Sequence, residues 1–305
     1  MVRCAAVNPV SDPRRPASRA RPLLRLPLVV LCVVGCHAPP NFLLELGEAR
    51  ETAADLRIQF NQADDASNRS VMADTDEASI AFAHEAQGAT QRVENDRAAL
   101  TRLLQDLNYR KELDALADFD KRWADYVALD RTVLELAVEN TNLKAQKLAF
   151  GPEREAADAF RAALETVPKE AAAKDGCRVD EIVAGAVLAV REIQVMQPPH
   201  IAEPSDETMT RLEAEMSARR AAARAALGEL APFIKPGSPS LAAATAALDR
   251  FDDLGAQIVK LSRQNTNVRS LDLALRAKPP LTAQCDQSLH RLQDALLAEG
   301  SKATR

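Results

Sequence analysis

The sequence predicts an all-α protein made of two tandem antiparallel four-helix bundles arranged end to end. Three observations favour this fold class. Residues 41–151 contain no proline, and the whole chain is rich in good helix formers such as Ala, Leu, Glu and Arg. The strict alternation of apolar and polar residues that is typical of a half-buried strand is absent. A segment of the chain also occurs twice, which indicates a duplicated helical unit.

The repeated segment contains an Asn-Thr-Asn sequence within an apolar frame. The stretch ENTNLKAQKLAF at 139–150 aligns without a gap with QNTNVRSLDLAL at 264–275, at an offset of 125 residues. A shorter match, SVM at 70–72 with QVM at 194–196, has an offset of 124. The two offsets predict that a unit of four helices has been duplicated.

Turn residues divide the chain into helical segments. We expect helices over residues 41–73, 75–107, 110–150, 152–168, 177–197, 205–230, 241–277 and 281–299. Two long helices are expected to stop at Gly151–Pro152 and before Pro279, because proline lacks a backbone N–H and clashes with the preceding turn. If Pro168 only kinks its helix, the helix continues into the second unit and joins the two bundles end to end. The alternative is that the two bundles pack side by side.

These boundaries place one bundle in residues 41–170 and the other in residues 171–300. The third helix of each unit carries inward residues at spacings of three and four, a period typical of antiparallel bundles with knobs-into-holes packing. In the first unit these residues are Leu116, Phe119, Trp123, Tyr126, Asp130, Val133, Ala137 and Asn140.

The first 35 residues are predicted to be a signal peptide. Six arginines precede the apolar run LPLVVLCVVG at 26–35, which is shorter than the about 20 residues needed to span a bilayer. The string VVGC at 33–36 resembles the lipobox of bacterial lipoproteins, which implies lipidation of Cys36; an ordinary cleaved signal is the alternative. We therefore expect an exported protein, anchored by lipid on Cys36 and facing the periplasm or the cell surface.

In this interpretation residues 36–40 form a short tether and residues 301–305 a tail. Residues 1–35 hold six of the 39 basic residues and one of the 44 acidic residues, so the remaining chain has a net charge of about −10. Such a balance argues against nucleic acid as a partner, because phosphate binding requires clusters of basic residues. It also argues against broad docking on anionic lipid.

The sequence contains no pattern of residues that predicts catalysis. The four histidines, His37, His84, His200 and His290, are scattered and lack metal-ligand spacing. Glycine-rich phosphate loops and nucleophile motifs are absent, and most carboxylates lie on expected solvated helix faces. We therefore expect no metal, no cofactor and no enzymatic activity.

Two cysteines of the predicted mature chain could form a disulfide in an exported protein. Cys285 falls on an apolar stripe with Leu289 and Leu292, however, and is well placed as a small core residue. Cys177 lies in the polar turn KDGCR. Both interpretations are open at this point.

Six residues are candidates for ligand contact, each with a structural alternative. Asn140 and Asn265 occupy inward positions, where a buried amide sets the helix register or binds a solute. Trp123 and Tyr126 either fill the core or line a site for an organic ligand. Another pair, Arg220 and Arg224, lies on one helix face and either faces solvent or clamps a carboxylate or phosphate.

Residues 119–167 resemble the last two helices of the four-helix-bundle ligand-binding domain of bacterial methyl-accepting chemoreceptors. The shared features are the aromatic pair Trp123 and Tyr126, the break at Gly151–Pro152 and a short Ala-rich return helix. The resemblance implies a sensor domain that binds a small solute, and it suggests a homodimer. It covers residues 41–170 and, more faintly, 171–300.

The chain departs from the chemoreceptor pattern after the bundles. No second transmembrane helix and no cytoplasmic signalling hairpin follow in this sequence. We therefore expect that a sensor of this kind requires a membrane signalling protein as its partner. The alternative hypothesis is a structural scaffold lipoprotein that binds no ligand.

Overall fold

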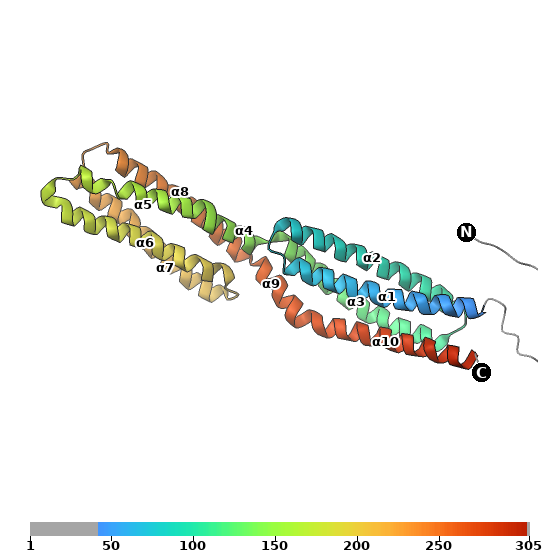
Figure 1. Ribbon diagram of the computed structural model, residues 1–305. Helices are drawn as coiled ribbons and strands as arrows, with labels where there is room; N and C mark the ends of the chain where they lie inside the picture. Colours follow the sequence, from blue (N-terminus) through green and yellow to red (C-terminus); the bar gives the residue numbers. More distant parts are fainter. Residues whose placement is uncertain (1–41, 304–305) are drawn as a thin grey trace, which may run out of the picture. The chain divides into compact units, whose positions relative to one another are not determined.

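The computed structural model describes residues 42–303, and the regular structure in this range is helical (Figure 1). No strand occurs among these residues, which confirms the all-α prediction. None of the helices in the described range combines the length and apolar character needed to cross a membrane. The predicted signal peptide, the tether and Cys36 lie outside the described residues.

The helices follow one another in two series with the same order. The first series consists of α1 (Phe42–Val71), α2 (Asp76–Asp106), α3 (Arg110–Glu139), α4 (Thr141–Leu148), the π-helix η1 (Ala149–Glu153) and α5 (Arg154–Leu164). The second consists of α6 (Gly176–Ala202), α7 (Asp206–Leu230), α8 (Pro239–Gln264), α9 (Thr266–Asp272), the π-helix η5 (Leu273–Ala277) and α10 (Lys278–Ala303). This order is what a duplicated unit requires.

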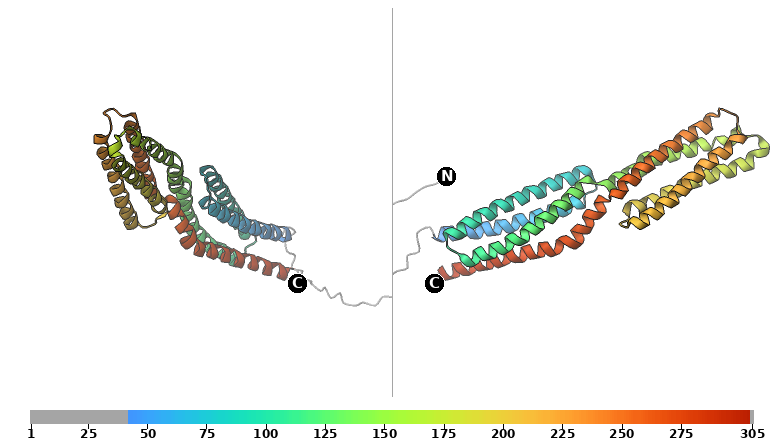
Figure 2. Two further views of the ribbon diagram at one scale, coloured as in Figure 1. Left: turned by 60° about the vertical axis from the view of Figure 1, so that its left-hand side comes forward. Right: turned by 180° about the vertical axis from the view of Figure 1, so that it is seen from behind.

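The helices pack in two groups, and each group takes helices from both series (Figures 1 and 2). In the first group α1, α2 and α3 pack with α10; in the second group α5 packs with α6, α7 and α8. The prediction that residues 41–170 and 171–300 each form a closed bundle is therefore wrong. The last helix of each series is exchanged, because α3–α4–α5 and α8–α9–α10 both run from one group into the other.

The core of the first group is built around an aromatic cluster. Phe60, Phe119, Trp123 and Tyr126 have ring centroids 5.3 to 6.4 Å apart in edge-to-face and stacked pairs. The exchanged helix α10 adds four fully buried residues to this core: Cys285, Leu289, Leu292 and Leu296. The aromatic core of the first group is therefore completed by the second series.

The core of the second group contains mainly aliphatic residues and Phe251 of α8. The exchanged helix α5 contributes Phe160 and Leu164, both fully buried. Cys177 and Cys285 are both free, so they form no disulfide with each other. Burial raises the pKa of the Cys285 thiol to about 12, which agrees with its predicted place in a core.

The helix ends differ from the prediction at the prolines. The helix continues through Pro152, which lies inside η1, and through Pro279, which is the second residue of α10 after η5. In a π-helix the hydrogen bonds shift to the fifth residue, and we attribute the tolerance of these prolines to this wider turn. Helix α6 also continues past Pro198 to Ala202, beyond its predicted end at Gln197.

The two long helices that pass between the groups are instead interrupted at asparagines. Asn140 (φ 50°, ψ 39°) separates α3 from α4, and Asn265 (φ 56°, ψ 35°) separates α8 from α9. Both adopt the left-handed conformation, which asparagine accepts more readily than most residues. Pro168 lies in a 3-10 turn after α5 has ended, so its helix is broken and not kinked. The end-to-end packing was expected on the basis of a kinked helix at Pro168, and this kink is absent.

The shorter sequence match does not mark equivalent positions. Val71 of SVM is buried at the end of α1, whereas Val195 of QVM is 74% exposed and lies well inside α6. The N-caps give a better correspondence for the hairpins. Thr75 and Ser205 each accept a hydrogen bond from the backbone N–H three residues later, as N-cap residues do.

The exchange of helices makes a testable prediction about the connection between the two series. A protease site inserted in the turns after α5, at residues 167–175, should allow cleavage without separation of the two halves. Each half would remain held by the helix that it contributes to the other group. Size-exclusion chromatography checks this: the halves should elute together in buffer and separately in denaturant. Separate elution in buffer would contradict the exchanged packing.

Candidate binding site

The two Asn-Thr-Asn segments lie against each other where α4 and α9 begin. The backbone N–H of Thr141 donates to Oγ1 of Thr266 (3.1 Å), and the N–H of Thr266 donates to Oγ1 of Thr141 (3.2 Å). Asn142 and Asn267 exchange backbone N–H to side-chain Oδ1 bonds in the same way, at 3.2 and 3.1 Å. Each segment therefore caps the first turn of the other's helix, where N–H groups have no intrahelical acceptor.

The side-chain amides extend this reciprocal pairing. Nδ2 of Asn142 donates to Oδ1 of Asn265, and Nδ2 of Asn267 donates to Oδ1 of Asn140, both at 2.8 Å. Asn265 also donates to the backbone oxygen of Glu203. The side chains of Asn140 and Asn265 thus contact protein groups, and they link the two repeats to each other.

A buried lysine lies inside the first group. Lys278, at the start of α10, is 2% exposed, and its Nζ is 2.8 Å from Oδ1 of Asp130 and 3.3 Å from Oδ1 of Asp64. Oδ1 of Asn68 accepts a further hydrogen bond from Nζ (3.3 Å). We call Lys278, Asp64 and Asp130 the buried cluster. It combines two carboxyl groups with a single ammonium group.

Hydroxyl groups complete the buried cluster. Asp64 accepts hydrogen bonds from the hydroxyls of Tyr126 (3.1 Å) and Thr282 (3.0 Å), and Asp130 accepts one from Ser67 (2.5 Å). Burial raises the pKa of Tyr126 far above its usual value, and the nearby carboxylates raise it further. The phenol therefore keeps its proton and acts as a hydrogen-bond donor within the cluster.

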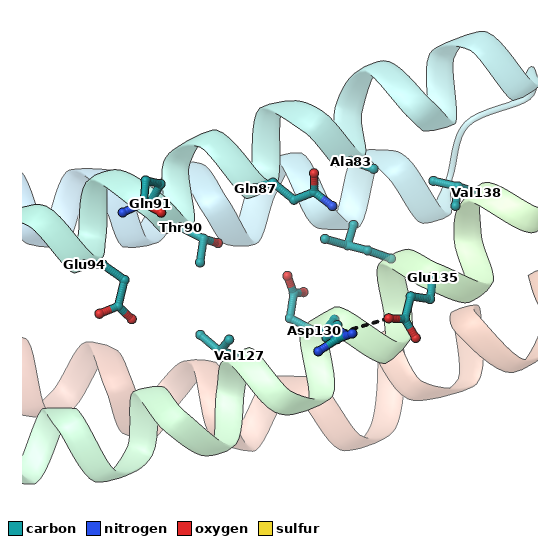
Figure 3. Close-up of a pocket in the computed structure, with 11 residues that line it drawn as sticks. Ala83, Gln87, Thr90, Gln91, Glu94, Val127, Asp130, Glu135 and Val138 are labelled. Atoms are coloured by element: carbon teal, nitrogen blue, oxygen red, sulfur yellow. Dashed lines mark hydrogen bonds and ion pairs between the residues drawn. The ribbon is translucent and has the colours of Figure 1, made fainter.

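A groove opens between α2 and α3 and reaches the buried cluster at Asp130 (Figure 3). Its volume is about 460 Å³, within the range of small-molecule sites. Residues of the two helices line it: Ala83, Gln87, Thr90, Gln91, Glu94, Val127, Asp130, Arg131, Leu134, Glu135 and Val138. The lining therefore combines four apolar side chains with seven polar or charged ones.

Asp130 differs from the other carboxylates of the groove. The side chains of Glu94 and Glu135 are paired: Glu94 accepts from Trp123 Nε1 (2.6 Å) and pairs with Arg97, and Glu135 pairs with Arg131. Asp130 is 3% exposed and is directed into the space between α2 and α3 (Figure 3). Ser67 and Lys278 both contact its Oδ1, and Oδ2 makes no hydrogen bond or ion pair with residues 42–303.

A second groove reaches the buried cluster from the opposite side of the first group. It lies between α1 and α10, has a volume of about 540 Å³, and includes Asp64 and Lys278 in its lining. The helices of the group contact one another in the order α1, α2, α3, α10, so these two grooves lie on opposite edges. The buried cluster thus borders a groove on each of two sides.

The second group fills the equivalent region with an arginine. Gly255 lies ten residues before Asn265, as Asp130 lies ten before Asn140. Arg220 follows its N-cap, Ser205, by fifteen residues, as Thr90 follows Thr75. Nη2 of Arg220 lies only 3.0 Å from where a side-chain carbon on Gly255 would stand. A guanidinium group therefore occupies the position that corresponds to the groove beside Asp130.

Arg220 pairs with a carboxylate there. Its Nε lies 2.8 Å from Oδ1 of Asp252 on α8, and Arg224 reaches Oδ2 of the same side chain (2.5 Å). Arg224 also contacts Asp249 at 2.8 Å. The predicted carboxylate clamp of Arg220 and Arg224 is thus occupied by carboxylates of the chain itself.

Glu153 occupies the position in the second group that corresponds to Lys278. Each lies thirteen residues after a left-handed asparagine. Glu153 is fully buried and accepts a hydrogen bond from Gln197. Burial raises its pKa to about 7, although the Gln197 bond and the charge of Arg220 act in the opposite direction.

The raised pKa of Glu153 makes stability depend on pH. Folding favours the protonated form, so this group is neutral to stability below about pH 4.5 and destabilises the fold progressively as the pH rises to about 7. Above that pH the loss should amount to about 3 kcal/mol relative to Glu153→Gln. Urea unfolding at pH 4.5, 6 and 8 measures it, with the exposed Glu155→Gln as the control. A difference that does not change with pH would contradict the prediction.

Trp123 and Tyr126, predicted either as core or as ligand contacts, lie in the aromatic core and do not line the groove. Asn140 and Asn265 also lie outside the groove between α2 and α3. Sequence reasoning placed Asp130 on the inward stripe but missed it as a site residue. A charged residue among apolar inward positions was the signal that could have identified it.

Residues 42–303 offer no group of three or more His, Cys, Asp or Glu side chains arranged to hold a metal ion. The candidate site is the groove between α2 and α3 that reaches Asp130. Comparison of the sequence with protein-family models and with curated proteins gave no match. The resemblance to chemoreceptor sensor domains stays a prediction.

Proposed function

We propose that the protein is a non-enzymatic binding protein of the cell envelope that takes up a small solute in the groove between α2 and α3. The observation that carries the proposal is Asp130. Its side chain is almost wholly buried, and Oδ2, which has no protein partner among residues 42–303, faces a groove of suitable volume in which a bound solute could contact it. If the protein acts as a sensor, we propose that its partner is a membrane signalling protein.

The envelope location in this proposal rests on the amino-terminal sequence. The arginine-rich segment, the short apolar run and VVGC support export and lipidation of Cys36. The intact mass of the protein purified from its native membrane tests this part. A mature chain that begins at an acylated Cys36 is expected, and a chain that retains residues 1–35 would contradict it.

Thermal unfolding against a panel of metabolites tests solute binding. A ligand at one hundred times its dissociation constant should stabilise the folded protein by about 2.7 kcal/mol, seen as a rise in Tm. Asp130→Asn should reduce this rise. If no compound in a broad panel changes Tm, the solute-binding proposal fails.

A structural scaffold without a ligand is the second candidate function. The reciprocal capping of the Asn-Thr-Asn segments favours it, because these buried polar groups serve to join the repeats. An unchanged Tm across the panel, together with a mature chain anchored at Cys36, would favour the scaffold over the sensor.

A further inference from the structure

We infer that the solute bound in the groove between α2 and α3 is a small organic cation whose guanidinium or primary ammonium group contacts Asp130. This inference rests on the proposed function, since it names the chemical class of the ligand for the same site. Two independent observations carry it: the charge of the buried cluster and the content of the corresponding region in the second group.

The buried cluster has fewer positive than negative groups. Lys278 is shared between Asp64 and Asp130, so two acidic side chains face one basic side chain. Asp64 is further satisfied by two hydroxyl donors, whereas Asp130 has one, and that bond is made to Oδ1. The position that lacks a positively charged hydrogen-bond donor is therefore Oδ2 of Asp130, the oxygen that has no hydrogen bond or ion pair with residues 42–303. A carboxylate or phosphate ligand would be repelled there.

The second group contains a cation at the corresponding place. Arg220, equivalent to Thr90, extends from α7 towards α8 and binds the carboxylate of Asp252. Its guanidinium lies beside Gly255, the equivalent of Asp130. The second group thus places the guanidinium of Arg220 beside Gly255. The first group has the shorter Thr90 and the carboxylate of Asp130 at these positions, with an open groove beside them. The packing of this region accommodates a guanidinium group when one is present.

The rest of the groove suits a short carbon chain next to the charged group. Val127 and Val138 of α3 provide apolar contact, and Gln87 of α2 provides an amide (Figure 3). Leu134 of α3 also lines the groove. Groups of this kind bury the alkyl part of an amine while its charged end is bound by Asp130. A compound with a chain of a few carbons and one cationic end suits this lining and is small enough to enter the groove.

Calorimetric titration of the full chain with a matched set of compounds tests the inference. Agmatine, butylguanidine and butylamine represent the cations, and 1-butanol and butyrate are the neutral and anionic compounds of similar length. The cations should bind, and butanol and butyrate should not. Asp130→Asn should weaken cation binding at least about tenfold, because a hydrogen bond to a charged group is lost.

A second variant avoids changing the buried cluster. Thr90→Arg places in the first group the arginine that the second group contains, and it should abolish cation binding and raise Tm. Ala98→Arg adds the same charge on an exposed part of α2 outside the groove, and it should bind the cations as the unchanged protein does. Circular dichroism checks that each variant is folded.

The outcomes separate this inference from the proposed function. Binding of butanol or butyrate without binding of the cations would overturn the inference and leave solute binding intact. No binding of any compound, in this set or in the broad panel, would overturn both. Cation binding that persists in Thr90→Arg would place the site elsewhere and overturn the assignment to Asp130.

Discussion

Replacing Lys278 with alanine is expected to lower the free energy of unfolding by about 3–5 kcal/mol, because a buried charge loses its partner. The change leaves Asp64 and Asp130 close to one another inside the first group without the ammonium that lies between them. It also removes the long side chain from a site that is 2% exposed, so a cavity adds to the loss. Urea denaturation at pH 7 measures the effect.

Two further variants serve as controls for Lys278→Ala. The exposed Lys260→Ala, on α8, should change stability by less than about 0.5 kcal/mol. A double variant, Lys278→Met with Asp130→Asn, should be more stable than Lys278→Ala because one buried carboxylate is neutralised and the cavity is filled. If Lys278→Ala and Lys260→Ala are equally stable, the buried cluster does not stabilise the fold.

Replacing Asn142 with alanine is expected to lower the free energy of unfolding by about 3 kcal/mol, since several buried groups lose their hydrogen bonds together. The amide of Asn142 donates to the backbone oxygen of Ile201 (2.5 Å) and to Asn265 (2.8 Å). Its Oδ1 accepts from the backbone N–H of Asn267 (3.1 Å). Without this side chain, all three partners remain buried or partly buried and unsatisfied.

Asn95→Ala is the matched control for Asn142→Ala. Asn95 is exposed on α2, and its side chain accepts a single hydrogen bond, from Gln91. Its replacement should change stability by less than about 0.5 kcal/mol. Equal effects of the two substitutions would show that the paired asparagines contribute little to joining the repeats.

The helical content of the protein could be predicted from sequence, but the partner of each helix could not. Apolar spacing identified the inward residues of α3, and Phe119, Trp123 and Tyr126 are indeed buried. The same spacing on α5 is compatible with packing in either group, because periodicity gives the buried face of a helix and not its neighbour. Which group receives α5 is decided by the path of the chain at Asn140.

The interruptions of the helices show a second limit. Gly151–Pro152 has the local signature of a helix end, yet the π-helical turn of η1 carries the chain through it. Asn140 lies in a segment of good helix formers, yet it is left-handed because the paired caps of Thr141 and Asn142 become available only when the other repeat is present. Tertiary contacts therefore override the local preference at both places.

The candidate site was only partly accessible to sequence reasoning. Asp130 could be placed on an inward face, but its pairing with Lys278 joins residues far apart in the chain. Lys278 itself stood next to two prolines that predicted the end of a helix. For Arg220 and Arg224 the alternatives were a solvated face and a clamp for a carboxylate or phosphate ligand, and both side chains pair with Asp252 of the same chain.

The reciprocal contact between the two Asn-Thr-Asn segments constrains how the gene can change. A substitution in one segment alters a surface that the other segment must match, so we expect tolerated substitutions in the two segments to compensate for each other. Positions without such mutual dependence have diverged, as Asp130 with Gly255 and Lys278 with Glu153 illustrate. The two repeats thus differ in the chemistry of these positions, while the paired segments and the exchanged helices hold them together.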